Sequence, residues 1–258
     1  MSRRLRLLLF TLAMLCTLPA VGRIAAHMPR FGAHPLPYGD AINDAAPRER
    51  HVTNMVTAVN FDYRGFDTLG EEFMLLCAVT GVVVLLRGAR GQDLSAEPGE
   101  VVGREIADRA DATVLLCRAI APLIVVFGIY VALHATVTPG GGFQGGVIVA
   151  SGLLLLYVGE GYRGWRRLVR SRLFDAFEGG GAALFVAAGL APMLLGRPFL
   201  ENVLPLGQLR DMLSGGLMLV VNAGVAFAVV GGFTLLFIEF MEETRAVREG
   251  DDPGEHPT

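Results

Sequence analysis

Residues 138–146 read TPGGGFQGG and decide the fold, because they separate two apolar runs that are each about long enough to cross a bilayer. Pro139 has no amide hydrogen and cannot continue a helix, and the glycines permit backbone conformations that other residues avoid. The stretch carries no charge. Non-helical backbone at membrane depth is stable only where protein or a water-filled cavity satisfies its polar groups. We therefore expect these residues to be non-helical and enclosed by other parts of the fold.

The composition indicates an integral membrane protein. Hydrophobic residues make up 52% of the 258 residues and charged residues only 18%, below the roughly 25% of soluble domains. The formal net charge of -3 argues against a nucleic-acid partner. The 3 cysteines lie in apolar runs without paired spacing, and His34 has no second histidine at ligand spacing, so no disulfide, metal site or cofactor is predicted.

Six apolar runs predict an all-α integral membrane fold with about six transmembrane helices. The first run follows three arginines and fits either a cleaved signal peptide or a first membrane helix. The Pro/Gly-rich break lies between the third and fourth runs. The last two runs are rich in small residues, which let helices pack closely. The runs span about residues 7–21, 73–86, 112–133, 147–158, 179–195 and 213–241.

The segment between the first two runs holds an irregular part and a short helix. Residues 29–40, PRFGAHPLPYGD, are predicted to lack regular structure. Val52, Met55, Val56 and Val59 then recur at helical spacing, which predicts a short extracytoplasmic amphipathic helix on the membrane surface or against a partner.

Acidic residues surround the start of the second run. Thr68 and Glu71 have capping-box spacing, so the helix is expected to begin near Leu69 with two glutamates in its first turn, where the helix dipole favours acids. Alternatively, Asp62, Asp67 and Glu71 form an acidic cluster at the membrane surface that collects protons or sodium ions.

The arginines predict the orientation. All 22 basic residues are arginine. If the chain crosses the membrane six times, most of them lie in segments on the same side of the membrane as the N-terminus. The positive-inside rule then places both termini in the cytoplasm and the break outside. Trp165, in a run with five arginines, is expected to anchor at the interface. Arg118 is expected to snorkel outward, and Glu160 and Glu239 to be solvated at cytoplasmic helix ends.

Two parts of the chain resemble known families. Residues 117–242 resemble the B subunit of the Mrp-type multi-subunit sodium/proton antiporters, through the words TPGGGFQGGV, FEGGGAALFVAAGL and VVNAGVAFAVVGGFTLLFIEF. Residues 54–71, NMVTAVNFDYRGFDTLGE, are similar to the carboxyl-terminal end of the A subunit of those antiporters and to a small membrane subunit of membrane-bound hydrogenases. Their adjacency suggests a fusion of two neighbouring subunits.

The resemblance implies four segments and a retained first helix in the inner membrane of a bacterial cell. A two-helix segment like the end of the A subunit occupies 1–90, and a cytoplasmic linker occupies 91–112. A four-helix domain like the B subunit occupies 113–245, and a disordered cytoplasmic tail occupies 246–258.

The function implied is that of a non-enzymatic accessory subunit of a Na+/H+ antiporter, needed for assembly and lining an ion path. Its partners would be the other subunits, the lipid bilayer, and Na+ and H+ as transported ions. A membrane-arm subunit of a hydrogenase-like redox complex is the alternative, and any redox chemistry would then belong to neighbouring subunits. A structural scaffold without ion contact is a third class.

The candidate ion-path residues come from the acidic segment, the break and the last helix. Thr138 and Gln144 either brace the broken helix or offer oxygens to a cation. Some family members carry aspartate where this chain has Asn222, which can coordinate sodium or bond between helices but cannot exchange a proton. No catalytic residue and no resident metal are predicted. The candidates are Asp67, Glu71, Thr138, Pro139, Gly140, Gly141, Gly142, Phe143, Gln144, Gly145, Gly146 and Asn222.

Overall fold

The computed structural model describes residues 3–28, 37–89 and 110–250, with side chains of the last helix described to residue 242. Most of the predicted linker at 91–112 and the end of the predicted tail, 251–258, lie outside these residues. Residues 1–41 and 42–258 form two compact units. The first unit contains helix α1 (Arg3–Ala26), which has no buried residue.

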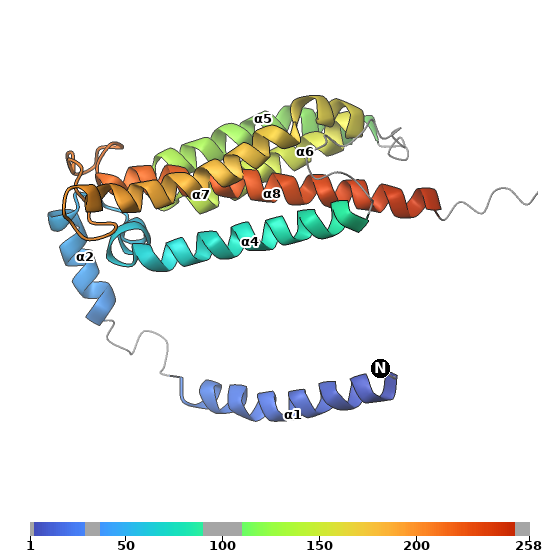
Figure 1. The fold of residues 1–258 in the computed structure, drawn as a ribbon, viewed down its shortest axis with the longest axis horizontal. Helices are drawn as coiled ribbons and strands as arrows, with labels where there is room; N and C mark the ends of the chain where they lie inside the picture. Colours follow the sequence, from blue (N-terminus) through green and yellow to red (C-terminus); the bar gives the residue numbers. More distant parts are fainter. Residues whose placement is uncertain (1–2, 29–36, 90–109, 251–258) are drawn as a thin grey trace, which may run out of the picture. The chain divides into compact units, whose positions relative to one another are not determined.

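Within the described residues, six helices are long and apolar enough to cross a membrane, which confirms the predicted all-α membrane fold. Apart from α1, they belong to the second unit and pack lengthwise in Figure 1. They are α4 (Gly65–Ala89), α5 (Asp111–Leu133), α6 (Gly142–Leu168), α7 (Ser171–Leu194) and α8 (Leu217–Gly250).

The helices of the second unit pack in both antiparallel and parallel pairs. Gly128, late in α5, contacts Gly145, early in α6, so this pair is antiparallel. α7 runs antiparallel to α8 in the same way, whereas α4 and α6 run parallel to α8. We call the end where α4, α6 and α8 begin the glycine end, and the other the opposite end (Figure 1).

Short helices precede α4. α2 (Pro37–Glu49) begins inside the stretch predicted to be irregular, because proline at the first helical position is already in a helical conformation and has no amide hydrogen to satisfy. The predicted amphipathic helix is present as α3 (Met55–Ala58), followed by a π-helical turn, η1 (Val59–Tyr63).

The capping box predicted at Thr68 is wrong. α4 already begins at Gly65, and the Thr68 hydroxyl donates a hydrogen bond of 2.7 Å to the carbonyl oxygen of Asn60 in η1. The π-helical turn brings this carbonyl within reach. Glu71 and Glu72 therefore lie in the second turn of α4, deeper than expected.

Two apolar cores lie along the bundle, one toward each end. The core at the glycine end includes Phe185, Met218 and Val225, and the core at the opposite end includes Trp165 and Leu235.

The prediction that Trp165 anchors at an interface is wrong. Its side chain is completely buried, and its indole Nε1 donates to the carbonyl oxygen of Leu153 at 2.7 Å. Gly161 has a φ of 71°, a conformation that glycine adopts readily, and it kinks α6. After this kink, the side chain of Trp165 packs in the interior of the bundle.

Buried and exposed ion pairs lie toward the opposite end. Arg87 of α4 pairs with Glu239 of α8 at 2.7 Å, with side-chain exposures of 7% and 0%. Glu239 is thus buried, and the expectation that it is solvated is wrong. The side chain of Arg118 is half exposed, as predicted, but it also forms an ion pair of 2.8 Å with the partly exposed Glu160.

Candidate functional site

The break in the membrane helices spans residues 134–141. α5 ends at Leu133 and α6 begins at Gly142, so the predicted non-helical stretch is non-helical only to Gly141. The later glycines of the motif start α6 and allow close packing. A Cβ atom on Gly145 would lie 2.6 Å from the carbonyl oxygen of Gly128.

The segment before α3 satisfies the polar backbone of the break. The Asn54 side chain caps α3, and its Nδ2 donates to the carbonyl oxygens of Ala135 at 2.8 Å and Thr138 at 2.9 Å. The Thr57 hydroxyl also donates to Ala135, at 2.6 Å. Ala135 and Thr136 are completely buried. The expectation that protein encloses the break is confirmed for this part of it.

Replacing Asn54 with alanine is expected to destabilise the chain, because it leaves buried carbonyls of the break without donors. The expected loss is about 1–3 kcal/mol, measured as a lower thermal midpoint of the detergent-solubilised complex. Asn54→Asp keeps the acceptor that caps α3 but removes the donors, so it should lose nearly as much. Wild-type stability of Asn54→Asp would show that the bonds to the break contribute nothing.

Asn222 of α8 joins the two helix ends on either side of the break. Its Oδ1 accepts a hydrogen bond of 2.6 Å from the backbone amide of Gly142, and its Nδ2 donates to the carbonyl oxygen of Ala132 at 2.9 Å. The side chain is only 5% exposed. Both polar atoms are engaged with backbone, so the geometry favours the interhelical hydrogen-bond interpretation of Asn222 over that of an ion ligand.

A pocket of about 210 Å³ lies beside the break. We call it the glycine pocket. The break, the α3–η1 segment, α4, α6 and α8 all contribute to its lining, which consists of Val56, Thr57, Asn60, Phe61, Thr68, Glu71, Glu72, Gly140, Gly141, Phe143, Gln144 and Val225.

Glu72 is the buried acid of the glycine pocket. The residue is only 5% exposed, and its Oε2 has no hydrogen-bond partner among the residues that the structure describes. From the sequence, Glu72 is expected only as an acid of the first helical turn. A signal was present, since Thr68, Glu72 and Val79 are spaced to share one face of α4 and all three are buried.

Some of the predicted ion-path residues line the glycine pocket, and the others do not. Glu71, Phe143 and Gln144 are exposed members of the pocket lining, and Gly140 and Gly141 line it with backbone. The other motif residues do not line it. Thr138 donates a long hydrogen bond of 3.4 Å to the carbonyl oxygen of His134. The remaining candidates that do not line the pocket are Pro139, Gly142, Gly145, Gly146 and Asn222.

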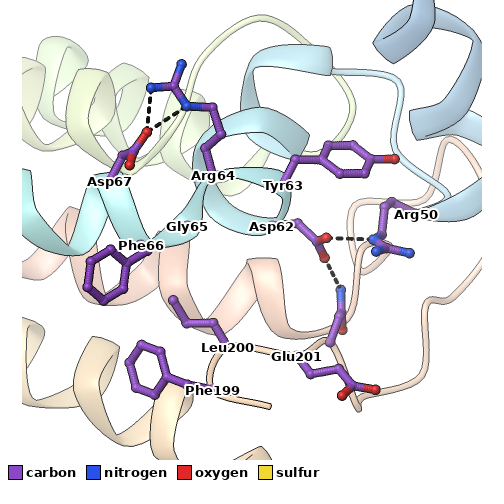
Figure 2. A pocket seen from close by; sticks show the side chains of 11 residues that line it. Arg50, Asp62, Tyr63, Arg64, Gly65, Phe66, Asp67, Phe199, Leu200 and Glu201 are labelled. Atoms are coloured by element: carbon purple, nitrogen blue, oxygen red, sulfur yellow. Dashed lines mark hydrogen bonds and ion pairs between the residues drawn. The ribbon is translucent and has the colours of Figure 1, made fainter. Parts of the chain in front are cut away.

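Asp67 lines a different pocket, of about 640 Å³, shown in Figure 2. Its carboxylate accepts a hydrogen bond of 2.6 Å from Arg64, while Asp62 accepts one of 2.7 Å from Arg50. Asp67 and Glu71 are one turn apart on α4, yet the structure pairs Asp62 and Asp67 with separate arginines. The predicted acidic cluster of Asp62, Asp67 and Glu71 is therefore divided, because arginines balance two of its carboxylates and only Glu71 lines the glycine pocket.

Two groups near this second pocket have altered acidity. Burial and a hydrogen bond of 3.1 Å to Glu49 raise the pKa of Tyr63, because both disfavour the phenolate. Partial burial disfavours the Arg50 cation, but the hydrogen bond and charge of Asp62 outweigh it, so the pKa of Arg50 lies above its ordinary value. Both residues therefore keep their ordinary protonation states at neutral pH.

Comparison with known proteins identifies the family. Residues 113–235 match the model of a domain related to the MnhB subunit of Na+/H+ antiporters. The Na+/H+ antiporter B subunit of Bacillus subtilis is 31% identical over 123 residues, which are 47% of this chain and 85% of that protein. The chain belongs to the MnhB family of Na+/H+ antiporter subunits.

Relatives of this MnhB family member include a fused protein. A probable K+/H+ antiporter A/B subunit of Rhizobium meliloti is 28% identical over 174 residues, which cover 62% of this chain but only 17% of that protein. The B-type sequence thus shares one chain with the A-type sequence there.

Two solved structures resemble this MnhB-family chain over nine tenths or more of its length. The Mrp complex from Dietzia contains a chain with a TM-score of 0.69 and 25% identity, and the match covers all of this chain and 27% of that one. A chain of the archaeal membrane-bound sulfane sulfur reductase, a respiratory complex, has a TM-score of 0.70 and 26% identity, with 92% and 98% covered. This fold therefore occurs in an Mrp complex and in an archaeal respiratory membrane complex.

Proposed function

We propose that this chain is an accessory membrane subunit of a multi-subunit Na+/H+ antiporter, which exchanges a monovalent cation for protons, and that its glycine pocket is part of the ion path. The observation that carries the proposal is Glu72, a buried carboxyl group beside the non-helical connection between α5 and α6, whose Oε2 has no hydrogen-bond partner among the described residues. Carbonyl groups of non-helical backbone coordinate cations in some transporters, and Gly140 and Gly141 of this connection line the glycine pocket.

The pocket has the chemistry of a small-cation site. An unpaired charge inside a membrane helix costs roughly 2.5–3.5 kcal/mol, so a carboxylate at Glu72 needs a compensating cation. Sodium is a hard cation that takes oxygen ligands, and the residues that line the pocket include Gln144 and Thr57, whose side chains carry oxygen atoms. A volume of about 210 Å³ has room for an ion with several waters, each about 30 Å³.

In this proposal, Glu71 forms the entrance and Glu72 the site. The exposed carboxylate of Glu71 raises the local concentration of cations by its charge, whereas the charge of Asp67 is balanced by Arg64 beside the other pocket. The arginines gathered toward the opposite end support an orientation with that end and both termini in the cytoplasm of a bacterial cell, so the glycine pocket would open outward.

We also propose that the chain unites two subunits. Residues 1–90 would correspond to the end of the A subunit, and residues 113–245 to the B subunit, with a cytoplasmic linker at 91–112 between them and a tail at 246–258. The family match beginning at residue 113 and the fused Rhizobium meliloti relative support this division.

A redox-driven complex is the second candidate, and the likeness to a chain of an archaeal respiratory complex favours it. Electron transfer would then take place in other subunits and drive the same membrane module. Purification from native membranes in a mild detergent separates the two. Copurifying subunits with iron-sulfur clusters would favour the redox complex, and antiporter subunits alone would favour exchange.

Glu72→Gln tests the ion path. In the assembled complex it is expected to lower Na+-driven proton movement in inverted vesicles about tenfold, because the amide keeps the shape but removes the charge that balances the cation. Glu71→Gln, at the entrance, should have a smaller effect. The matched control is Glu201→Gln, since Glu201 pairs with Arg197 away from the glycine pocket. Unchanged exchange in a fully assembled Glu72→Gln complex would refute the proposed path.

A further inference from the structure

A second buried carboxyl group lies in the other half of the bundle. Glu178 of α7 is 7% exposed, and its Oε1 has no hydrogen-bond partner within the described part of the chain. It is not among the residues that line the glycine pocket. An unpartnered carboxyl oxygen in a membrane helix is costly, so its presence calls for a functional explanation.

Glu178 occupies the seam between α4, α7 and α8. Gly232 of α8 leaves room for it, because a Cβ atom at that position would lie 3.3 Å from Glu178 Oε1. The same Cβ atom on Gly232 would lie 3.1 Å from Cγ2 of Val79 in α4. Val79 also belongs to the apolar core at the opposite end, together with Phe174 and Leu235. The carboxyl group therefore sits among glycine and hydrocarbon.

These surroundings select the ligand. A sodium ion needs several oxygen ligands, and the two groups that the structure shows beside the Glu178 carboxyl group on this side, Gly232 and Val79, offer no side-chain oxygen. A proton needs one lone pair of one oxygen, and binding it removes the charge that is costly in this place. We propose that Glu178 is a proton-binding site, distinct from the cation site in the glycine pocket. The inference rests on the proposed function and adds the site of the second ion.

Glu178 exchanges its proton with the opposite end of the bundle. Asp175 lies one turn closer to that end on α7, and it interacts electrostatically with Arg87 and Glu239. In the transfer, the O–H bond of Glu178 breaks, an O–H bond forms on the Asp175 carboxylate, and the negative charge moves to Glu178. No electron is transferred. Asp175 is exposed and can pass the proton on to water.

The two sites are separate but share α8. Val225 lines the glycine pocket and Gly232 faces Glu178, and they are about two helical turns, or roughly 10 Å, apart along α8. This distance is too long for a direct proton transfer. The cation would therefore enter from the glycine end and the proton from the opposite end, with the packed seam between them.

Carbodiimide labelling tests the proton site in the wild-type complex. Dicyclohexylcarbodiimide reacts with protonated carboxyl groups in apolar surroundings, and mass spectrometry locates the modified residue. We expect modification of Glu178 that saturating Na+ does not prevent. Absence of modification at Glu178, or its protection by Na+, would overturn the inference.

Exchange and binding by variants complete the test. Glu178→Gln is expected to lower exchange at least about tenfold and to leave 22Na+ binding by the purified complex unchanged, whereas Glu72→Gln should lower both. Glu178→Asp keeps a titratable group and should retain more exchange than Glu178→Gln, which keeps the test valid if the amide impairs assembly. Normal exchange by assembled Glu178→Gln, or loss of its Na+ binding, would overturn the proton site. Normal exchange and Na+ binding by Glu72→Gln alone would overturn only the proposed cation path.

Discussion

Replacing Gly142 with alanine is expected to prevent stable assembly of the bundle. A Cβ atom there would lie 2.8 Å from the backbone nitrogen of Ala226 and still closer to the backbone oxygen of Asn222. Both are main-chain atoms of α8, so no side-chain rotation can relieve the contact. Separating α6 from α8 would also break the hydrogen bond from Gly142 to Asn222. The cost should be about 3 kcal/mol or more, at the upper end of overpacking effects.

The measurement is the yield and thermal midpoint of the complex after size-exclusion chromatography in detergent. Gly81→Ala is the matched control, because a Cβ on this α4 glycine would meet nothing within 4 Å and alanine favours a helix. If Gly142→Ala were as stable as Gly81→Ala, the close approach of α6 to α8 would not matter for assembly.

Removing one partner of the buried Arg87–Glu239 pair is expected to cost about 3–5 kcal/mol. Arg87→Met takes the cation away from a carboxylate whose side chain is completely buried, and water cannot replace it. The double variant with Arg87→Met and Glu239→Met should recover much of the loss, since two apolar side chains leave no buried charge.

Thermal unfolding of the purified complex measures these effects. The exposed pair Arg118–Glu160 is the control, and Arg118→Met should cost only about 0–1 kcal/mol. Equal losses for Arg87→Met and Arg118→Met would contradict the distinction between buried and exposed pairs. A double variant as unstable as Arg87→Met would show that charge burial is not the cause.

The sequence predicts the spans and the break well, because both depend on local composition. Long apolar runs specify membrane helices by their length, and proline with successive glycines interrupts them at one place. The end of the break was placed too late. Glycines permit irregular backbone, but those from Gly142 onward are used for close helix contacts that depend on residues far along the chain.

The sequence does not reveal contacts between positions that are far apart along the chain. Glu239 is buried because Arg87 meets it from 152 positions away, and the choice between the two interpretations of Asn222 depends on backbone atoms 80 and 90 positions away. No local pattern contains such pairs. Likewise, the kink at Gly161 turns Trp165 inward, which the run of arginines around it concealed.

The candidate site was predicted in outline but not in its central group. The glycine motif and Glu71 do line the pocket, yet the buried acid is the adjacent Glu72. Neighbouring helical positions point about 100° apart, so an error of a few residues in the start of α4 obscures which glutamate faces inward. The second buried acid, Glu178, gave no local signal because α4 and α8 create its surroundings.

The chemistry of residue 222 decides whether the seam between α5 and α6 responds to acidity. A carboxamide accepts and donates at the same time without a titratable proton, so Asn222 keeps both helix ends tied across the whole physiological pH range. An ionised carboxylate could still accept from Gly142 but would turn a lone pair toward the carbonyl of Ala132. With aspartate here, only the neutral acid would reproduce both bonds, and every deprotonation would loosen the joint.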